Sequence, residues 1–243
     1  MSYNGMLLSL QRRAASGVTI GANYTWSHCI GDYGDVHGEG PESYDTYMDA
    51  NNRSFDRGDC RGDRRHVFNL TPVAETPRFD NRTLRTVATG WRFSAIYRYS
   101  SGAPLAVLAG TDRALNGDAR NQRVNQVLGN AYGDRSGGPL TSYLNPDAFA
   151  QPATGTLGSL GRSNIQGPGT WQFDVAVTRI FPIRENQRLE FRAEAYNVTN
   201  SFRPGDFPTC QSGTCQSLNS NTFGQIRTAR DPRLMQFALK YLF

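Results

Sequence analysis

Six acidic side chains lie within one polar stretch of the sequence, and carboxylate oxygens are ligands that Ca²⁺ prefers. Their spacing is not that of an EF-hand loop, which needs ligands at alternate positions and a closing Glu. The pattern therefore favours a solvated loop over a calcium site. Tyrosines in the same stretch could stack on a glycan or pack the loop against its neighbours. The acidic residues are Asp32, Asp35, Glu39, Glu42, Asp45 and Asp49, and the tyrosines are Tyr33, Tyr44 and Tyr47.

The three histidines, His28, His37 and His66, are scattered along the chain, and no Ser or carboxylate stands at a distinctive spacing from them. Nucleophilic or general acid–base catalysis needs such a partner within hydrogen-bond reach. His66 lies in RRHVF at the start of a predicted strand, where a packing role is expected. We expect no enzymatic activity and no cofactor.

The four cysteines all fall in predicted loops, and an even number of loop cysteines fits an oxidising compartment. Pairing Cys29 with Cys60 would close a long loop, and pairing Cys210 with Cys215 would close a short one. Cys-x4-Cys is not a usual zinc spacing, so disulfides are favoured over a metal site.

The net charge of +5 is carried almost entirely by arginine, because Lys240 is the only lysine. A basic balance can indicate a nucleic-acid partner. The arginines here form no basic run and alternate with apolar residues in predicted strands. The sequence therefore predicts no nucleic-acid binding.

The elements that must position these residues are amphipathic strands. In the terminal segment RLMQFALKYLF, apolar or aromatic residues occupy every second position from Met235 to Phe243. This period of two is typical of a strand with one apolar face. The length fits the roughly 9–11 residues of a tilted strand that crosses a bilayer. The same alternation recurs in VTIGANYTWS, WRFSAIYRYS, WQFDVAVTRIF and RLEFRAEAYN.

The alternation assigns each strand residue to a face. We predict that the apolar set contacts lipid, and that the polar set lines the interior of a barrel. The predicted lipid-facing residues are Trp91, Phe93, Tyr97, Trp171, Phe173, Leu189, Phe191, Phe237, Leu239 and Tyr241. The predicted lumen-facing residues are Arg92, Arg98, Asp174, Glu190, Arg192, Glu194, Gln236 and Lys240.

Short turns and long loops alternate along the chain, as periplasmic turns and extracellular loops do in outer-membrane barrels. The long loops are expected over 28–64 and 101–170, and FGQIRTA is expected to continue or begin the last strand. The count is seven or eight strands and is nearer seven, whereas bacterial barrels use even numbers. The predicted strands are Tyr3–Arg13, Val18–Ser27, Arg65–Val73, Gly90–Ser100, Trp171–Phe181, Arg188–Asn197 and a last strand that ends at Phe243.

Several segments resemble the C-terminal part of TonB-dependent outer-membrane receptors of the Oar-like, acidobacterial type. They include RAEAYNVTN, LGRSNIQGPG and DPRLMQFALKYLF, and the resemblance covers nearly the whole chain. It implies an all-β fold in which 1–243 is the last third of a 22-stranded antiparallel transmembrane barrel. Family members also carry a signal peptide, a carboxypeptidase-regulatory-like domain, and a plug with a TonB box. None of these is expected within 1–243.

The resemblance implies localisation in the outer membrane, with outer-membrane lipid as surroundings and the N-terminal strands and plug of a longer parent as partners. It implies transport of a substrate only in the intact parent, through contact of the plug with TonB. The final strand resembles the signal that the barrel-assembly machinery recognises, and this signal would comprise Phe237, Leu239, Tyr241 and Phe243.

Two other functions are compatible with the strand pattern. One is a small self-sufficient outer-membrane barrel that serves as an adhesin or a barrel enzyme. The other is a soluble β-sandwich that binds carbohydrate.

Overall fold

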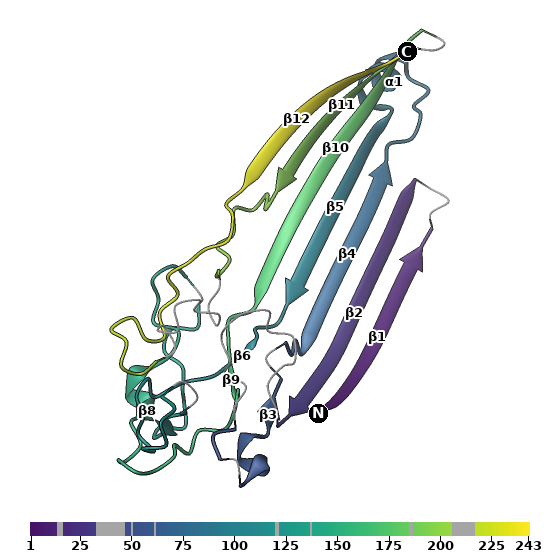
Figure 1. Cartoon of the computed structure of the whole chain (residues 1–243). Helices are drawn as coiled ribbons and strands as arrows, with labels where there is room; N and C mark the ends of the chain where they lie inside the picture. The colour runs from purple at the N-terminus through teal and green to yellow at the C-terminus, as the bar shows by residue number, and fades with distance from the viewer. Residues whose placement is uncertain are drawn as a thin grey trace.

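The computed structural model describes residues 1–13, 17–32, 47–49, 51–60, 62–119, 122–136, 138–184, 187–205 and 217–243. Its main element is one antiparallel sheet in which each long strand pairs with the next long strand of the sequence (Figure 1). The two-residue strand β3 (Gly58–Asp59) adds to the end of the second strand. The long strands are β1 (Ser2–Arg12), β2 (Val18–Gly31), β4 (His66–Glu75), β5 (Trp91–Ser100), β10 (Thr170–Arg184), β11 (Gln187–Tyr196) and β12 (Leu234–Leu242).

The register of the sheet follows the alternation of the sequence. Residues directly opposite one another in an antiparallel pair point to the same face. Thr178 of β10 lies opposite Arg92 of β5 and opposite Arg192 of β11. Glu190 of β11 lies opposite Lys240 of β12. Polar residues therefore lie opposite polar residues across successive strands. A shift of the register by one residue would place polar and apolar side chains on the same face.

The two ends of the sheet differ, as Figure 1 shows. The connections at one end are short, and the longest holds the helix α1 (Arg82–Ala88). Asn81 caps this helix, since its side-chain oxygen accepts hydrogen bonds from the backbone N–H of Thr83 and of Leu84. An Asn at this position satisfies amide groups that have no partner within the helix. The sequence pattern indicated only a plain connection here.

At the other end, the described parts of the segments between β5 and β10 and between β11 and β12 fold into a compact unit, which we call the loop module (101–119, 122–136, 138–169 and 217–229). It has its own buried core, although we had expected a long loop from 101 to 170. Its short elements are β6 (Pro104–Leu105), β7 (Asn125–Gln126), a 3₁₀ helix (Pro146–Ala148), β8 (Phe149–Ala150) and β9 (Ile165–Gln166). Its core comprises Leu105, Val107, Ala109, Val124, Ala131, Tyr143, Leu144, Ala148, Phe149, Leu160, Ile165, Phe223 and Ile226.

Several predicted boundaries were wrong. Strand β4 ends at Glu75 rather than at Val73. Strand β2 continues to Gly31, so His28 and Cys29 lie on a strand rather than in a loop, because β1 and β3 both pair with this extension. Strand β10 continues to Arg184. FGQIRTA belongs to the loop module rather than to the last strand: Phe223 and Ile226 are buried in its core, and Gly224 has a φ of 69° that interrupts a strand.

Within the described part of the chain, no helix is both long enough and apolar enough to cross a membrane.

Candidate functional site

The polar face of the sheet gathers all eight residues that were predicted to face a lumen. The register places the even-numbered residues of β5, β10, β11 and β12 on one side of the sheet. Arg92, Arg98, Asp174, Glu190, Arg192, Glu194, Gln236 and Lys240 all belong to this set. The ten residues predicted to face lipid lie on the opposite side, which we call the apolar face.

Ion pairs on the polar face form both between neighbouring strands and within one strand. Arg92 Nε donates to Glu75 Oε1 at 2.7 Å. The Arg192 guanidinium lies between two carboxylates, 3.9 Å from Glu190 and 3.4 Å from Glu194. Their arginines are more than half exposed, so each pair contributes little stability. The arrangement gives this face of the sheet a charged surface with exposed arginines.

Asp174 lies on this face, is only 6% exposed, and accepts three hydrogen bonds. Its Oδ2 accepts a hydrogen bond from Arg98 Nη2 at 2.7 Å. Its Oδ1 accepts from Gln172 Nε2 at 2.7 Å and from the backbone N–H of Asn197 at 2.8 Å. A buried carboxylate is stable only when it is paired in this way. Asp174 therefore ties β5, β10 and the end of β11 together where the strands meet the loops.

Arg203 extends this network into the segment that follows β11. It donates to Gln172, and its Nη2 donates to the backbone oxygen of Asp231 at 2.7 Å. Sequence patterning assigned Gln172 to the inward face of its strand, but it did not single out Arg203. These hydrogen bonds hold the segment that follows β11 against the end of the sheet.

Much of the apolar face is exposed in the described structure. Phe237 and Leu239 of β12 are each 67% exposed, and Phe93 of β5 is 46% exposed. Burial of apolar area contributes roughly 25 cal/mol per Å². A face this apolar and this large indicates a surrounding medium other than water.

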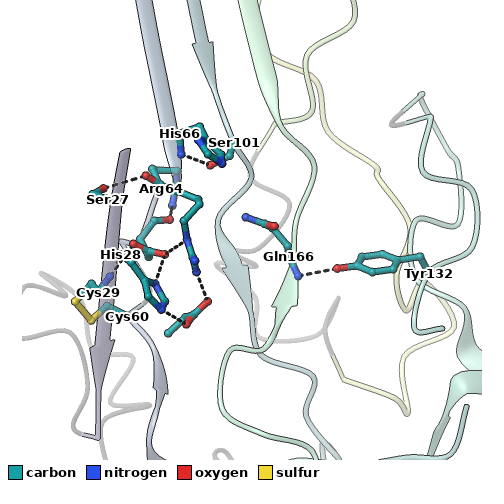
Figure 2. A network of polar contacts seen from close by, with 12 residues as sticks. Ser27, His28, Cys29, Cys60, Arg64, His66, Ser101, Tyr132 and Gln166 are labelled. Carbon is teal, nitrogen blue, oxygen red and sulfur yellow. Dashed lines mark hydrogen bonds and ion pairs between the residues drawn. A yellow bond between two sulfur atoms is a disulfide. The ribbon is translucent and has the colours of Figure 1, made fainter. Parts of the chain in front are cut away.

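Figure 2 shows the polar contacts at the loop end of β2. Cys29 of β2 and Cys60 form a disulfide, which is the long-loop pair expected from the sequence. Ser27 Oγ donates to the backbone oxygen of Arg64 at 3.1 Å, and the N–H of Cys29 donates to Asp63 Oδ1 at 3.0 Å. These contacts hold the returning chain against β2. The other predicted pair, Cys210–Cys215, lies outside the described residues.

His28, Asp59 and Asp63 converge beside this disulfide, with one potential ligand atom from each within 4.8 Å of the others. The guanidinium of Arg65 lies 3.6 Å from Asp59 and 3.7 Å from Asp63. The positive charge beside both carboxylates is thus supplied by an arginine, in the place where a metal ion would otherwise supply it. Burial raises the pKa of Asp59 above its usual range, while His28 and Arg65 act in the opposite direction. The cluster is best explained as an ion-pair network that packs the loop onto β2.

Two of the six acidic candidates, Asp32 and Asp49, are described, and so is Tyr47. Asp32 forms an ion pair with Arg53 at 2.9 Å, and the same guanidinium lies 5.3 Å from the centre of the Tyr47 ring. The backbone N–H of Asn51 donates to Asp49 Oδ1 at 3.0 Å. The other candidates for calcium or glycan contact lie outside the described residues: Asp35, Glu39, Glu42, Asp45, Tyr33 and Tyr44.

A buried ion pair joins the β2–β4 connection to the loop module, and sequence reasoning missed it. Arg123 Nη1 lies 2.6 Å from Asp56 Oδ1, and both side chains are nearly inaccessible to water. Arg123 also donates to the backbone oxygens of Leu160 and Phe55, both at 2.8 Å. Asp56 lies in the 3₁₀ helix Arg53–Asp56 and accepts from the N–H of Met48 at 2.8 Å. No local motif marks either residue, because they are 67 positions apart.

The end of the predicted assembly signal is exposed. Phe237, Leu239 and Tyr241 share the apolar face of β12, and Phe243 follows the strand with 94% of its surface exposed. The Tyr241 and Phe243 rings are stacked with centroids 5.9 Å apart. β12 is also an edge strand, so its outer backbone groups are open to pairing.

Residues 1–236 match the family described as outer membrane beta barrel domain. The chain belongs to this family. An outer-membrane barrel domain accounts for the antiparallel topology, for the alternation of polar and apolar faces, and for the uncovered apolar face. It also indicates localisation in the outer membrane. No match to this chain was found among curated proteins.

Proposed function

We propose that this domain forms the C-terminal part of the barrel of a TonB-dependent transporter, in which the polar face lines the lumen. The described sheet contributes seven long strands, and the parent barrel would contribute the rest. Substrate uptake or export would belong to the intact parent, whose plug would contact TonB.

The observation that carries this proposal is the direction of the two edge strands. β1 and β12 are the first and seventh of seven successive antiparallel strands, so they run in the same direction. Direct closure of this sheet would require one parallel pair. Bacterial outer-membrane barrels are antiparallel with an even number of strands. This supports a barrel in which both edges pair with further strands, since unpaired backbone groups in lipid cost several kcal/mol each.

The charged polar face supports a wide lumen rather than a packed one. Eight-stranded barrels have interiors just wide enough to be filled by side chains, whereas the largest barrels enclose a plugged lumen. Arg98 and Arg192 are about half exposed on this face, as expected for a wall that meets water or a plug.

The edges can be tested by crosslinking in outer membranes that contain the complete polypeptide carrying this sequence. A Leu8→Cys variant on β1 is combined in turn with cysteines at the apolar-face positions of β12, including Leu239→Cys. Leu70→Cys with Tyr97→Cys is the matched control, since these residues are direct partners on β4 and β5. Cα atoms of such partners lie about 4.5–5.5 Å apart, within reach of a disulfide.

We expect a crosslink in the control and none between β1 and β12. A crosslink between the edges would overturn the proposal and favour the small self-sufficient barrel. The transport component has a separate test, which is photocrosslinking of the complete polypeptide to TonB in living cells. We expect a product that is absent from a strain lacking TonB, and its absence from both strains would contradict energised transport.

A further inference from the structure

The short helix α1 lies against the apolar face at the turn end of the sheet. Trp91 Nε1 donates to the backbone oxygen of Val87 at 2.8 Å. Arg179 donates to the backbone oxygen of Thr86. Trp91 and Arg179 are direct partners on β5 and β10 and belong to the apolar face. The last turn of α1 therefore extends the apolar face past the ends of the strands.

The helix has two unlike sides. At 100° per residue, Leu84, Val87 and Ala88 fall on one side, and Arg82, Arg85 and Thr86 on the other. Leu84 is 48% exposed and Val87 is 61% exposed, so the helix does not bury them against the sheet. Arg82 and Arg85 are exposed and have no carboxylate partner among the described residues. Exposure of the apolar side of α1 to water would be unfavourable, which indicates that this side contacts something other than water.

Arg179 shows how the surface beneath α1 is built. Its guanidinium lies 5.0 Å from the centre of the Trp91 ring and 4.5 Å from that of Phe181. Its Nε is buried without a hydrogen-bond partner in the described structure. Trp and Tyr are enriched at the membrane–water interface, and a cation close to an aromatic ring is attracted to it.

We propose that α1 is an interfacial anchor that lies in the headgroup layer of the leaflet at the turn end of the barrel. Leu84 and Val87 enter the boundary with the acyl chains, and Arg82 and Arg85 bind phospholipid phosphates. Two observations select a lipid surface as the occupant. The apolar side of α1 is continuous with the uncovered apolar face of the sheet, and its basic side complements anionic headgroups.

The test measures the depth of a nitroxide label in the complete polypeptide reconstituted into phospholipid vesicles. The label is attached at Leu84→Cys, and Arg85→Cys on the opposite side of α1 is the matched control. The unsubstituted protein is carried through the same labelling to correct for native cysteines. Only preparations that form a folded, membrane-inserted barrel are compared. The readout is the ratio of collision rates with oxygen, which concentrates in lipid, and with a water-soluble nickel complex.

We expect the label at position 84 to lie about 5–10 Å into the headgroup and acyl boundary. The label at position 85 should be accessible to the nickel complex. In vesicles containing phosphatidylglycerol, Arg82→Gln with a second change Arg85→Gln should lower the ratio at position 84, with a smaller change in phosphatidylcholine alone. Water-like ratios at both positions would overturn the proposal. So would a label at position 84 that is shielded in native membranes but accessible to water in vesicles, since a protein partner would then cover α1.

Discussion

The sheet and the loop module are built for different surroundings. Leu105, Leu144 and Ile226 of the loop module have no exposed surface, whereas Phe237 and Leu239 of the sheet are each 67% exposed. The loop module buries apolar residues against one another, as a water-soluble domain does. The sheet turns them outward. The buried apolar cluster of the chain thus lies in the loop module and not in the sheet.

The same contrast holds for charge. In the loop module, Arg123 and Asp56 form an ion pair that is sealed from water. On the polar face, Arg92 and Glu75 form a pair in which both side chains are at least half exposed. Removal of one partner should be costly in the first case and nearly neutral in the second.

The largest effect is therefore expected from Asp56→Ala. It leaves the guanidinium of Arg123 buried without its counter-charge, which typically costs about 3–5 kcal/mol. Amide hydrogen exchange around 122–126 should show a corresponding loss of protection. Glu75→Gln is the control and should cost about 0–1 kcal/mol. Replacing both members, with Asp56→Leu and Arg123→Met, should restore much of the protection. Equal effects of Asp56→Ala and Glu75→Gln would contradict the contrast between the two regions.

A second prediction concerns the two faces of β12. Leu239→Arg places a charge on the apolar face near the middle of the strand and should cost about 2–4 kcal/mol at the bilayer midplane. Ala238→Arg places the same charge on the polar face opposite Arg192 and should cost much less. Urea titration of the complete polypeptide in lipid vesicles measures both variants. Similar costs at the two positions would reject the assignment of faces.

The Cys29–Cys60 disulfide gives a third prediction, at the border between the two regions. Replacing both cysteines by serine removes a link across 31 positions and should cost about 2–4 kcal/mol. The effect should be confined to the β2–β4 connection, because β2 keeps its pairing with β1 and β4. Limited proteolysis should cut residues 47–65 faster while the strands stay protected. Accelerated cleavage within β2 and β4 themselves would show that the disulfide supports the sheet.

The sheet could be predicted from the sequence because its information is local. A period of two in segments such as WRFSAIYRYS indicates both the strand and its faces without knowledge of its neighbours. β2 and β10 extend beyond the predicted ends because partner strands continue alongside them. Contacts of that kind cannot be identified within one segment.

The loop module could not be predicted, because its core joins short apolar pieces that show no regular period. Leu105, Leu144 and Phe223 come from segments that are far apart in the sequence and pack in one cluster. The seven-residue helix α1 was missed for a related reason, since its apolar residues span only one turn. Of the candidate sites, the polar face followed from patterning, whereas the Arg123–Asp56 pair depends entirely on tertiary folding.

The smallest effect on stability is expected from deletion of Phe243, which extends past the end of β12 with 94% of its surface exposed. Its contact with Tyr241 is a single ring stack, a contribution of about 0.5–1.5 kcal/mol. If Phe243 belongs to an assembly signal, the deletion should instead sharply reduce the amount of barrel that reaches the outer membrane. The physical reason is that an exposed edge strand can add to the edge of another sheet, with its side chains supplying specificity.

Two measurements on the complete polypeptide separate these roles. The first is the fraction of protein found as folded barrel in the outer membrane rather than in the periplasm. The second is the urea midpoint of the barrel that does assemble. An assembly signal predicts a large fall in the first with little change in the second. Tyr196→Ala is a control for loss of an aromatic ring elsewhere, since Tyr196 is 40% exposed at the loop end of β11. Normal assembly with a slightly lower midpoint would show that Phe243 only anchors the strand at the membrane interface.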